Sequence, residues 1–299
     1  MSLISFVKLE KENRIGKAIE DSLDLIQYKL PSDAKNIVIK PNMCYYWDWT
    51  TGQTTDPRFV AALVDVLRKK IGSHVDISII ESDASAMKCK HAFRMLGYER
   101  MAQEYNVKLV NLSEDKSDPT EVKVEGQSLH LMVPSTIQKA NLKINVPKIK
   151  YMAASDVKIT CALKNIYGCN PYPKKFRYHS KLAETIVAIN KAMKFDLCIA
   201  DGIVVSGIQP RKLGLVMASR DPVAFDVAAA RIAGENHRKI RYIRLAHEEG
   251  LGSTTLIPKG EPLNYFEARY PRKSIEMRFR GIAYRLAVRT GLSTRLGLE

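Results

Sequence analysis

The chain has 299 residues and a mass of 33.7 kDa, and 45% of its residues are apolar while 26% are charged. This size and composition exclude a disulfide-stapled mini-protein and a wholly disordered chain, because so many apolar residues can bury a sizeable core. The 47 Lys and Arg residues exceed the 32 Asp and Glu residues, which gives a formal net charge of +15. The excess predicts an anionic partner: a nucleic acid, a lipid headgroup, or a carboxylate or phosphate metabolite.

Apolar runs of strand length alternate with stretches of helical periodicity along most of the chain. Strands are predicted at 36–40, 75–81, 107–112, 142–146, 196–200 and 213–218. Helices are predicted at 15–30, 57–70, 87–106, 180–193, 222–233 and 238–249. This alternation predicts an α/β fold with a doubly wound, mostly parallel sheet.

Residues 121–133 interrupt that pattern. Two alternating runs flank Gly126 and predict an inserted β-hairpin. No internal repeat or low-complexity linker divides the chain. We therefore expect one α/β domain over residues 1–257, followed by a basic C-terminal helical extension over residues 258–299.

Membrane spans and cysteine frameworks are not predicted. No apolar run reaches the roughly 18 residues that a span needs, and the first residues are too short for a signal-peptide core, so a cytoplasmic protein is expected. The five cysteines are odd in number and include no C-x-x-C pair, so they predict reduced, mostly buried thiols and no iron–sulfur cluster. They are Cys44, Cys89, Cys161, Cys169 and Cys198.

Charged and polar side chains follow five of the predicted strands. Ligands of open α/β sheets bind beyond the carboxyl ends of the strands, so these residues are candidates for one shared site. The cationic and amide candidates for holding an anion are Lys40, Asn42, Lys148 and Lys150. The acidic candidates are Glu81, Asp83, Asp201 and Asp221. Asp201 with Glu81 or Asp83 would act as a general base or bind Mg²⁺, and the alternative for each residue is an ordinary solvated charge.

Lys164 is the strongest single candidate. It lies with Asn165 in the otherwise apolar stretch 159–168, where a lysine is unfavourable to bury without a partner. The surrounding residues 126–183 carry ten Lys and Arg residues and one acid. This field concentrates anions, so Lys164 is predicted to be catalytic or anion-binding; the alternative is a lysine whose stem runs out to solvent.

Two further segments offer candidates with weaker signals. His179 follows a basic, aromatic loop and would act as an acid or base, although a lone histidine is more often a surface residue. Thr54 and Thr55 precede a predicted helix start and would orient an anion there. The aromatic run 44–49 before them would either line a ligand or pack a long loop onto the body. No phosphate-binding glycine motif accompanies them.

Residues 268–299 carry eight Arg and Lys residues and two acids, with apolar residues at helical spacing. This segment would bind anionic membrane, RNA or a second subunit, or it would pack back onto its own domain. A homodimer is therefore among the expectations.

Several short motifs together resemble a known family. They span residues 37–253 and are Lys40-Pro41-Asn42, 54–57 (TTDP), 145–150 (NVPKIK), 160–168 (TCALKNIYG), His179, 201–203 (DGI), 219–226 (SRDPVAFD) and 250–252 (GLG). The chain resembles the domain-of-unknown-function 362 proteins, some of which carry an added ferredoxin-like iron–sulfur segment. It departs from the family pattern at Met152, where a histidine is usual, and at 207–210, where an acidic Gly-Pro segment is usual. The resemblance implies the same site residues, without the iron–sulfur segment.

These observations predict an enzyme that acts on a small carboxylate or phosphate metabolite. Lysines opposed to carboxylates suit carbanion stabilisation in an isomerase or lyase, and redox chemistry is equally allowed. The alternative is a non-catalytic protein whose basic surface and tail bind RNA or anionic membrane.

Overall fold

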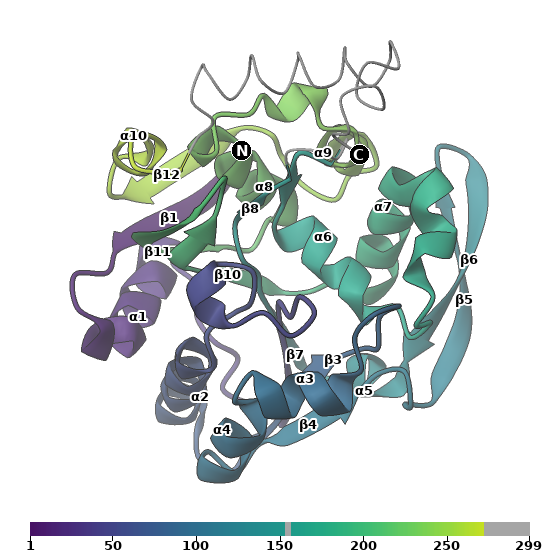
Figure 1. Cartoon of the computed structure of the whole chain (residues 1–299), viewed down its shortest axis with the longest axis horizontal. Helices are drawn as coiled ribbons and strands as arrows, with labels where there is room; N and C mark the ends of the chain where they lie inside the picture. The colour runs from purple at the N-terminus through teal and green to yellow at the C-terminus, as the bar shows by residue number, and fades with distance from the viewer. Residues whose placement is uncertain (153–156, 272–299) are drawn as a thin grey trace, which may run out of the picture.

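The computed structural model describes residues 1–152 and 157–271, and within them ten strands form one sheet that helices cover on both faces (Figure 1). The order across the sheet is β12-β1-β11-β10-β7-β2-β3-β4, and β8 pairs with β10 and β9. The strands are β1 (Ser2–Lys8), β2 (Asn36–Pro41), β3 (Asp76–Glu81), β4 (Lys108–Asn111), β7 (Leu142–Val146), β8 (Lys150–Tyr151), β9 (Ile159–Thr160), β10 (Leu197–Ser206), β11 (Pro210–Ser219) and β12 (Leu256–Gly260). A separate two-stranded sheet contains β5 (Ser117–Val124) and β6 (Gln127–Pro134).

Ten α-helices lie within the described residues. They are α1 (Ile15–Leu25), α2 (Pro57–Ile71), α3 (Cys89–Met95), α4 (Tyr98–Glu104), α5 (Ser135–Gln138), α6 (Ala162–Ile166), α7 (Leu182–Met193), α8 (Pro222–Ile232), α9 (Arg241–Glu248) and α10 (Leu263–Glu267). Short 3-10 helices are η1 (Glu12–Arg14), η2 (Trp49–Thr51), η3 (Tyr167–Cys169), η4 (Lys175–Lys181) and η5 (His237–Lys239).

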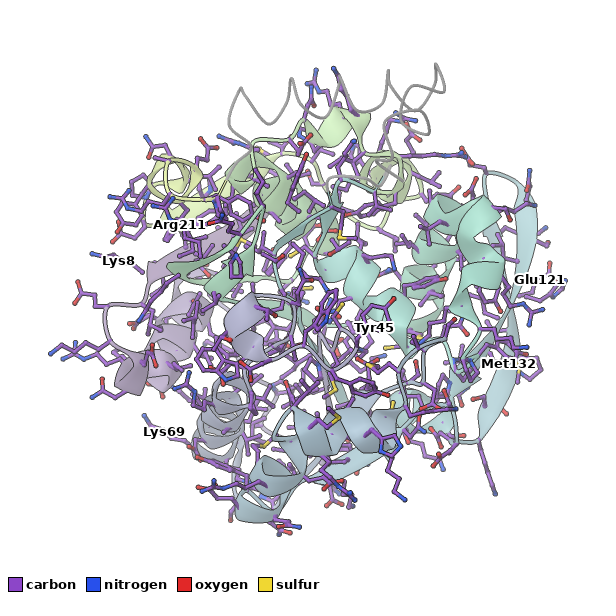
Figure 2. The ribbon with its side chains drawn as sticks, in the orientation of Figure 1. Lys8, Tyr45, Lys69, Glu121, Met132 and Arg211 are labelled. Atoms are coloured by element: carbon purple, nitrogen blue, oxygen red, sulfur yellow. The ribbon has the colours of Figure 1, made fainter. Side chains whose placement is uncertain are left out.

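Alternating side chains of the central strands build two cores. Ile37 and Ile39 of β2 pack with the layer of α1 to α4, whereas Val38 between them packs with the layer of α6 to α9. This division follows from the period of two in an extended strand. Side chains fill both layers, and charged ones such as Lys69 and Glu121 point outward (Figure 2).

The predicted fold class is confirmed. The strands from β10 through β7, β2 and β3 to β4 are all parallel to their neighbours. The hairpin is also present, four residues longer at its start than the predicted 121–133, and it flanks α7 (Figure 1).

Three predicted helices differ from the observed ones. The helix expected at 87–106 is two helices, α3 and α4, because Gly97 between them adopts a φ of 81° that ends the first helix. The helix expected at 15–30 ends at Leu25, and the one expected at 238–249 divides into η5 and α9.

The expectation that five strand ends meet at one edge is wrong for β11. This strand runs antiparallel to β10, with Ile199 opposite Ala218 and Ser206 opposite Pro210. The residues after β11 therefore lie at the edge of the sheet opposite to the ends of β2, β3 and β7. An apolar pattern does not show in which direction a strand runs. The antiparallel orientation of β11 could therefore not be predicted from the sequence.

Four strands were not predicted: the short β8 and β9, and β1 and β12, which together form one side of the sheet. β1 pairs antiparallel with β11 and parallel with β12. The boundary predicted after residue 257 falls inside β12. Of the predicted basic extension, residues 272–299 lie outside the described residues. No helix in the described part is long and apolar enough to cross a bilayer.

Candidate functional site

A cavity of about 540 Å³ lies beside the carboxyl ends of β2, β3 and β7, and residues of α6 line it as well. We call it the lysine cavity, because five lysines line it: Lys40, Lys148, Lys150, Lys164 and Lys175. The predicted site residues Asn42, Glu81 and Asn165 line it as well. Side chains that are distant in sequence thus converge on one hollow at the carboxyl edge of the parallel strands, as such folds favour.

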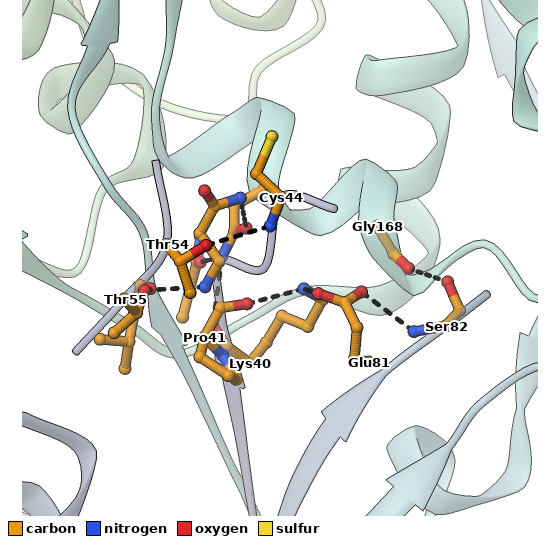
Figure 3. Close-up of polar contacts among 12 residues, drawn as sticks. Lys40, Pro41, Cys44, Thr54, Thr55, Glu81, Ser82 and Gly168 are labelled. Carbon is orange, nitrogen blue, oxygen red and sulfur yellow. Dashed lines mark hydrogen bonds and ion pairs between the residues drawn. The ribbon is translucent and has the colours of Figure 1, made fainter. Parts of the chain in front are cut away.

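Lys40 and Glu81 form a buried ion pair at the ends of two adjacent strands (Figure 3). Lys40 Nζ lies 2.8 Å from Glu81 Oε2 and also donates to the Pro41 carbonyl at 2.7 Å. The Ser82 backbone N–H donates to the other carboxylate oxygen of Glu81 at 2.9 Å. Because both carboxylate oxygens are occupied, Glu81 balances Lys40 rather than offering a free base.

Lys148 and Asp201 form a second buried pair, with 2.9 Å between Nζ and Oδ2. Asp201 Oδ2 also accepts from the Asp56 backbone N–H at 2.8 Å, and Oδ1 accepts from the Ile203 N–H at 3.1 Å. Asp201 lies inside strand β10 rather than after it, and it does not line the cavity. Its carboxylate therefore acts on the cavity only indirectly, by fixing the position of Lys148.

The other three lysines of the cavity have no ion-pair partner among residues 1–152 and 157–271. Lys150 Nζ donates to Asn42 Oδ1 at 2.7 Å and to the Gln53 carbonyl at 3.3 Å. Lys175 Nζ donates to Ser82 Oγ and to the Asp83 carbonyl. Lys164 Nζ lies 4.1 Å from the centroid of the Tyr167 ring. Uncompensated positive charge therefore collects in this hollow.

Burial lowers the pKa of all three of these lysines, because an ammonium loses its hydration there. The effect is largest for Lys164, whose pKa falls to about 7 through burial and then through the charges of Lys150 and Lys175. Its amine therefore loses its proton more readily than that of an exposed lysine. A lysine poised in this way is able to accept a proton or to bind an anion.

Three asparagines join the cavity wall to α6. Asn42 Nδ2 donates to Asn165 Oδ1 at 3.0 Å, and Asn165 Nδ2 donates to Asn145 Oδ1 at 2.7 Å. Asn145 Nδ2 in turn donates to the Ala162 carbonyl at 2.9 Å. This network turns the Asn42 oxygen toward Lys150. Asn145 was not singled out as a site residue, although it is the last polar residue of the predicted strand 142–146 and lies two residues before a proline.

Thr54 and Thr55 hold the wall instead of facing the cavity (Figure 3). Thr55 Oγ1 accepts from the Asn42 N–H at 2.9 Å and donates to the Val146 carbonyl at 2.9 Å. Thr54 Oγ1 accepts from the Cys44 N–H at 3.4 Å. The loop between β2 and α2 is thus fixed at its base, and the anion contact predicted for the two threonines stays a prediction.

Two predicted acids lie elsewhere. Asp221 caps α8 at the opposite edge of the sheet, where Oδ1 accepts from Val223 and Ala224 N–H groups at 2.8 and 2.9 Å. Asp83 faces the start of α3 and pairs with Lys88 at 2.8 Å, which lowers the pKa of its carboxyl below the usual value against the effect of burial.

The magnesium ligands predicted from the sequence do not come together. Glu81, Asp83 and Asp201 are each held by a different lysine. Throughout residues 1–152 and 157–271, no three His, Cys, Asp or Glu side chains are grouped as a metal ion would need. His179 falls within η4, and its side chain lies outside the described part of the chain.

Lys175 is the main residue that sequence reasoning missed. It is the first residue of η4 and follows Lys174, a second lysine that is exposed. The Tyr167 hydroxyl donates to the Lys175 carbonyl at 2.6 Å and so fixes the backbone there. Neither the choice between the two lysines nor this contact is visible in the sequence.

A larger hollow of about 1080 Å³ lies outside α1, α2 and α4. Some of its charges are paired: Arg58 lies 2.7 Å from Asp56 and 3.1 Å from Glu12. The smaller lysine cavity is the candidate site, because it lies at the carboxyl edge of the parallel strands and gathers three lysines that have no ion-pair partner among residues 1–152 and 157–271.

The fold and the cavity define an α/β protein with a basic pocket at the edge of a mostly parallel sheet. The family model described as Domain of unknown function (DUF362) matches residues 37–231, and the chain belongs to this family. No curated protein matches the chain.

The solved structures that are similar to the chain include the following two. One is the lactate racemase apoprotein from Thermoanaerobacterium thermosaccharolyticum, with a TM-score of 0.47, 12% identity, and coverage of 78% of this chain and 57% of that one. The other is a protein from Thermotoga maritima, with a TM-score of 0.42, 10% identity, and coverage of 81% and 60%. The chain spans less than two thirds of the length of each.

Proposed function

We propose that the chain is an enzyme that binds a small carboxylate or phosphate metabolite in the lysine cavity and removes a proton from it with Lys164. The observation that carries the proposal is the set of three lysines without a carboxylate partner among the described residues: Lys150, Lys164 and Lys175. A bound anion would compensate charges that the chain itself leaves unbalanced.

Lys164 is suited to the role of general base. A base works best when its pKa is near the working pH, and the pKa of Lys164 is about 7. The neutral amine would take a proton from the carbon next to a carboxylate or carbonyl group. The electron pair of that C–H bond would stay on the substrate as an enolate, and Lys150 and Lys175 would stabilise its charge.

The carboxylates have positioning roles in this proposal. Glu81 and Asp201 form ion pairs with Lys40 and Lys148. They therefore fix the positions of these two lysines, which form the floor of the cavity, and neither carboxylate acts as the base. No role is proposed for Asp221, which caps a helix at the far edge. The role predicted for His179 and the predicted use of Mg²⁺ stay predictions.

Calorimetric titration with inorganic phosphate and with pyruvate tests the binding step. Both anions should bind, and Lys164→Met should weaken both. Loss of the pyruvate methyl proton signal in D₂O, followed by NMR, tests the catalytic step. We expect exchange faster than in buffer with the wild-type chain and none above buffer with Lys164→Met. If neither phosphate nor pyruvate bound, the assignment of the lysine cavity as an anion site would be wrong. Pyruvate binding without proton exchange would contradict the catalytic role of Lys164.

The alternative function, binding of RNA or anionic membrane through residues 268–299, also stays a prediction, because residues 272–299 lie outside the described part. Deletion of that segment would abolish such binding, and the affinity for RNA would fall steeply with salt. The predicted homodimer is tested by the mass of the chain in solution.

A further inference from the structure

Two exposed aromatic rings line the mouth of the lysine cavity. The side chains of Tyr45 and Trp47 both line the cavity, although the residues are 46% and 50% exposed. Their ring centroids are 5.4 Å apart, and the ring planes are tilted by 55°. Figure 2 labels Tyr45 near the middle of the face in view rather than at its margin. Large apolar groups at a cavity mouth, still open to solvent, are typical of surfaces that a ligand covers.

The backbone holds these rings in place. Tyr45 has a φ of 52°, in the left-handed region that a bulky residue rarely occupies. Such a conformation persists only where neighbouring contacts enforce it. Here Trp47 N–H donates to the Cys44 carbonyl at 3.3 Å, and the Tyr46 hydroxyl accepts from the Lys88 N–H at 3.0 Å. The aromatic turn is therefore ordered before any ligand arrives.

Methionine side chains form an apolar, adaptable part of the cavity wall. Met43 and Met87 are buried in it, and Met152 stands at its exposed end. Thioether side chains adapt to the shape of a ligand and contact aromatic rings favourably. The cavity volume of about 540 Å³ lies in the range of whole organic ligands, so an inorganic anion would leave most of it empty.

We propose that the ligand of this cavity is an anion joined to a planar aromatic body: the anionic group lies on Lys150, Lys164 and Lys175, and the ring lies against Trp47 and Tyr45. This inference rests on the proposed function, since it assumes the anion site. It adds the chemical class of the rest of the molecule, an aryl or heteroaryl carboxylate or phosphate.

The test compares matched pairs of probes by calorimetry: inorganic phosphate with phenyl phosphate, and pyruvate with phenylpyruvate. The aromatic member of at least one pair should bind about tenfold more tightly, as expected for one stacked ring. Trp47→Ala should remove this advantage and leave the affinity for the small anion unchanged. In a Trp49→Phe background Trp47 is the single tryptophan, so its fluorescence should change with phenyl probes only.

Tyr172→Ala is the matched control, since Tyr172 is an exposed aromatic residue that does not line the cavity. It should leave every affinity unchanged. Equal affinities within both pairs would overturn the inference and leave the anion site standing, whereas no binding of any probe would reject the proposed function itself. If Trp47→Ala lowered binding to phosphatidylglycerol vesicles and had no effect on phenyl probes, the ring would be a membrane contact and the inference would be wrong.

Discussion

Lys164 Nζ lies 4.1 Å from the centre of the Tyr167 ring, in a hollow where no carboxylate of the described residues pairs with it. A ring face attracts a cation only modestly, and it cannot replace lost hydration. The amine therefore stays ready to lose its proton or to meet an anion.

Replacement of Lys164 by methionine should separate function from stability. Methionine keeps the length of the side chain and removes a charge that is unfavourable where it lies. We expect anion binding to fall at least tenfold, while the free energy of unfolding changes by less than about 1 kcal/mol. Urea unfolding and calorimetry measure the two quantities. Lys174→Met, at an exposed lysine nearby, should change neither, and a large loss of stability in Lys164→Met with binding intact would contradict the assignment.

Anion affinity should decrease as the pH rises through about 7. The pKa of Lys164 lies near that value, so the charge that attracts an anion is lost above it. A single linked proton gives at most a tenfold decrease per pH unit. The profile is measured by titrating inorganic phosphate between pH 6 and 9 and normalising for the phosphate charge. Lys164→Met should flatten it; a normalised affinity that stays constant in the wild-type chain would count against a neutralised lysine.

Asp226 should make the fold less stable as the pH rises toward neutrality. Its Oδ1 accepts from Ala162 and Leu163 N–H groups at the start of α6, the helix that carries Lys164. Burial raises the pKa of this carboxyl to about 7 from an ordinary 3.8. The folded chain thus holds a proton that the unfolded chain has lost between those values, and stability falls across that window.

Asp226→Asn tests this expectation, because an amide oxygen still accepts from the helix start and does not ionise. The difference in unfolding free energy between pH 4.5 and 7.5 should shrink in the variant. If this difference in unfolding free energy were the same in Asp226→Asn and in the wild-type chain, groups other than Asp226 would cause the pH dependence.

The buried Lys148–Asp201 pair should matter far more to stability than a surface pair. Asp201→Asn leaves an ammonium buried without its counter-charge, for which we expect a loss of about 3 to 5 kcal/mol in urea unfolding. The exposed Lys17–Asp21 pair has a similar distance of 2.7 Å, and Asp21→Asn should cost far less, because solvent already screens both charges. Equal losses in the two variants would contradict the burial argument.

Gly168→Ala should disturb the floor of the cavity. A Cβ there would lie 3.1 Å from Lys40 Nζ and 3.2 Å from Glu81 Oε1, tighter than ordinary contact. We expect weaker phosphate binding and a lower melting temperature. Gly16→Ala in α1 is the control, since its Cβ would meet Val66 at an ordinary 3.8 Å and it should be neutral or stabilising. If Gly168→Ala bound phosphate with the affinity of the wild-type chain, the positions of Lys40 and Glu81 would not control anion binding.

The sequence predicted the parallel half of the fold and three of the cavity's lysines, Lys40, Lys148 and Lys150, for the same reason. The strand at 36–40 has an apolar centre and ends in Lys40, and the strand at 142–146 is followed at once by Pro147 and Lys148, so both the sheet and its polar edge were visible. Asp221 shows the limit of that reasoning. It also follows a strand, but only the direction of β11 decides which edge it reaches, and that direction depends on pairing with β10.

The partners of each charge were likewise beyond prediction. Lys148 and Lys150 are two residues apart and equally basic, yet Lys148 lies against Asp201 and Lys150 against Asn42. These contacts join segments 53 and 108 residues apart in the chain. Local patterns carry no information about such pairings, so the sequence gives candidates for a site and the packing assigns their roles.

The position of β1 in the sheet affects how the chain is made in a cell. Ser2 pairs with Leu256, and Ser5 pairs with Ala218, so β1 is translated long before either of its neighbours in the sheet. During that interval its unpaired amide and carbonyl groups and apolar side chains are open to other nascent chains. Slow translation or a shortage of chaperones should therefore lower the yield of this protein by leaving β1 unpaired for longer.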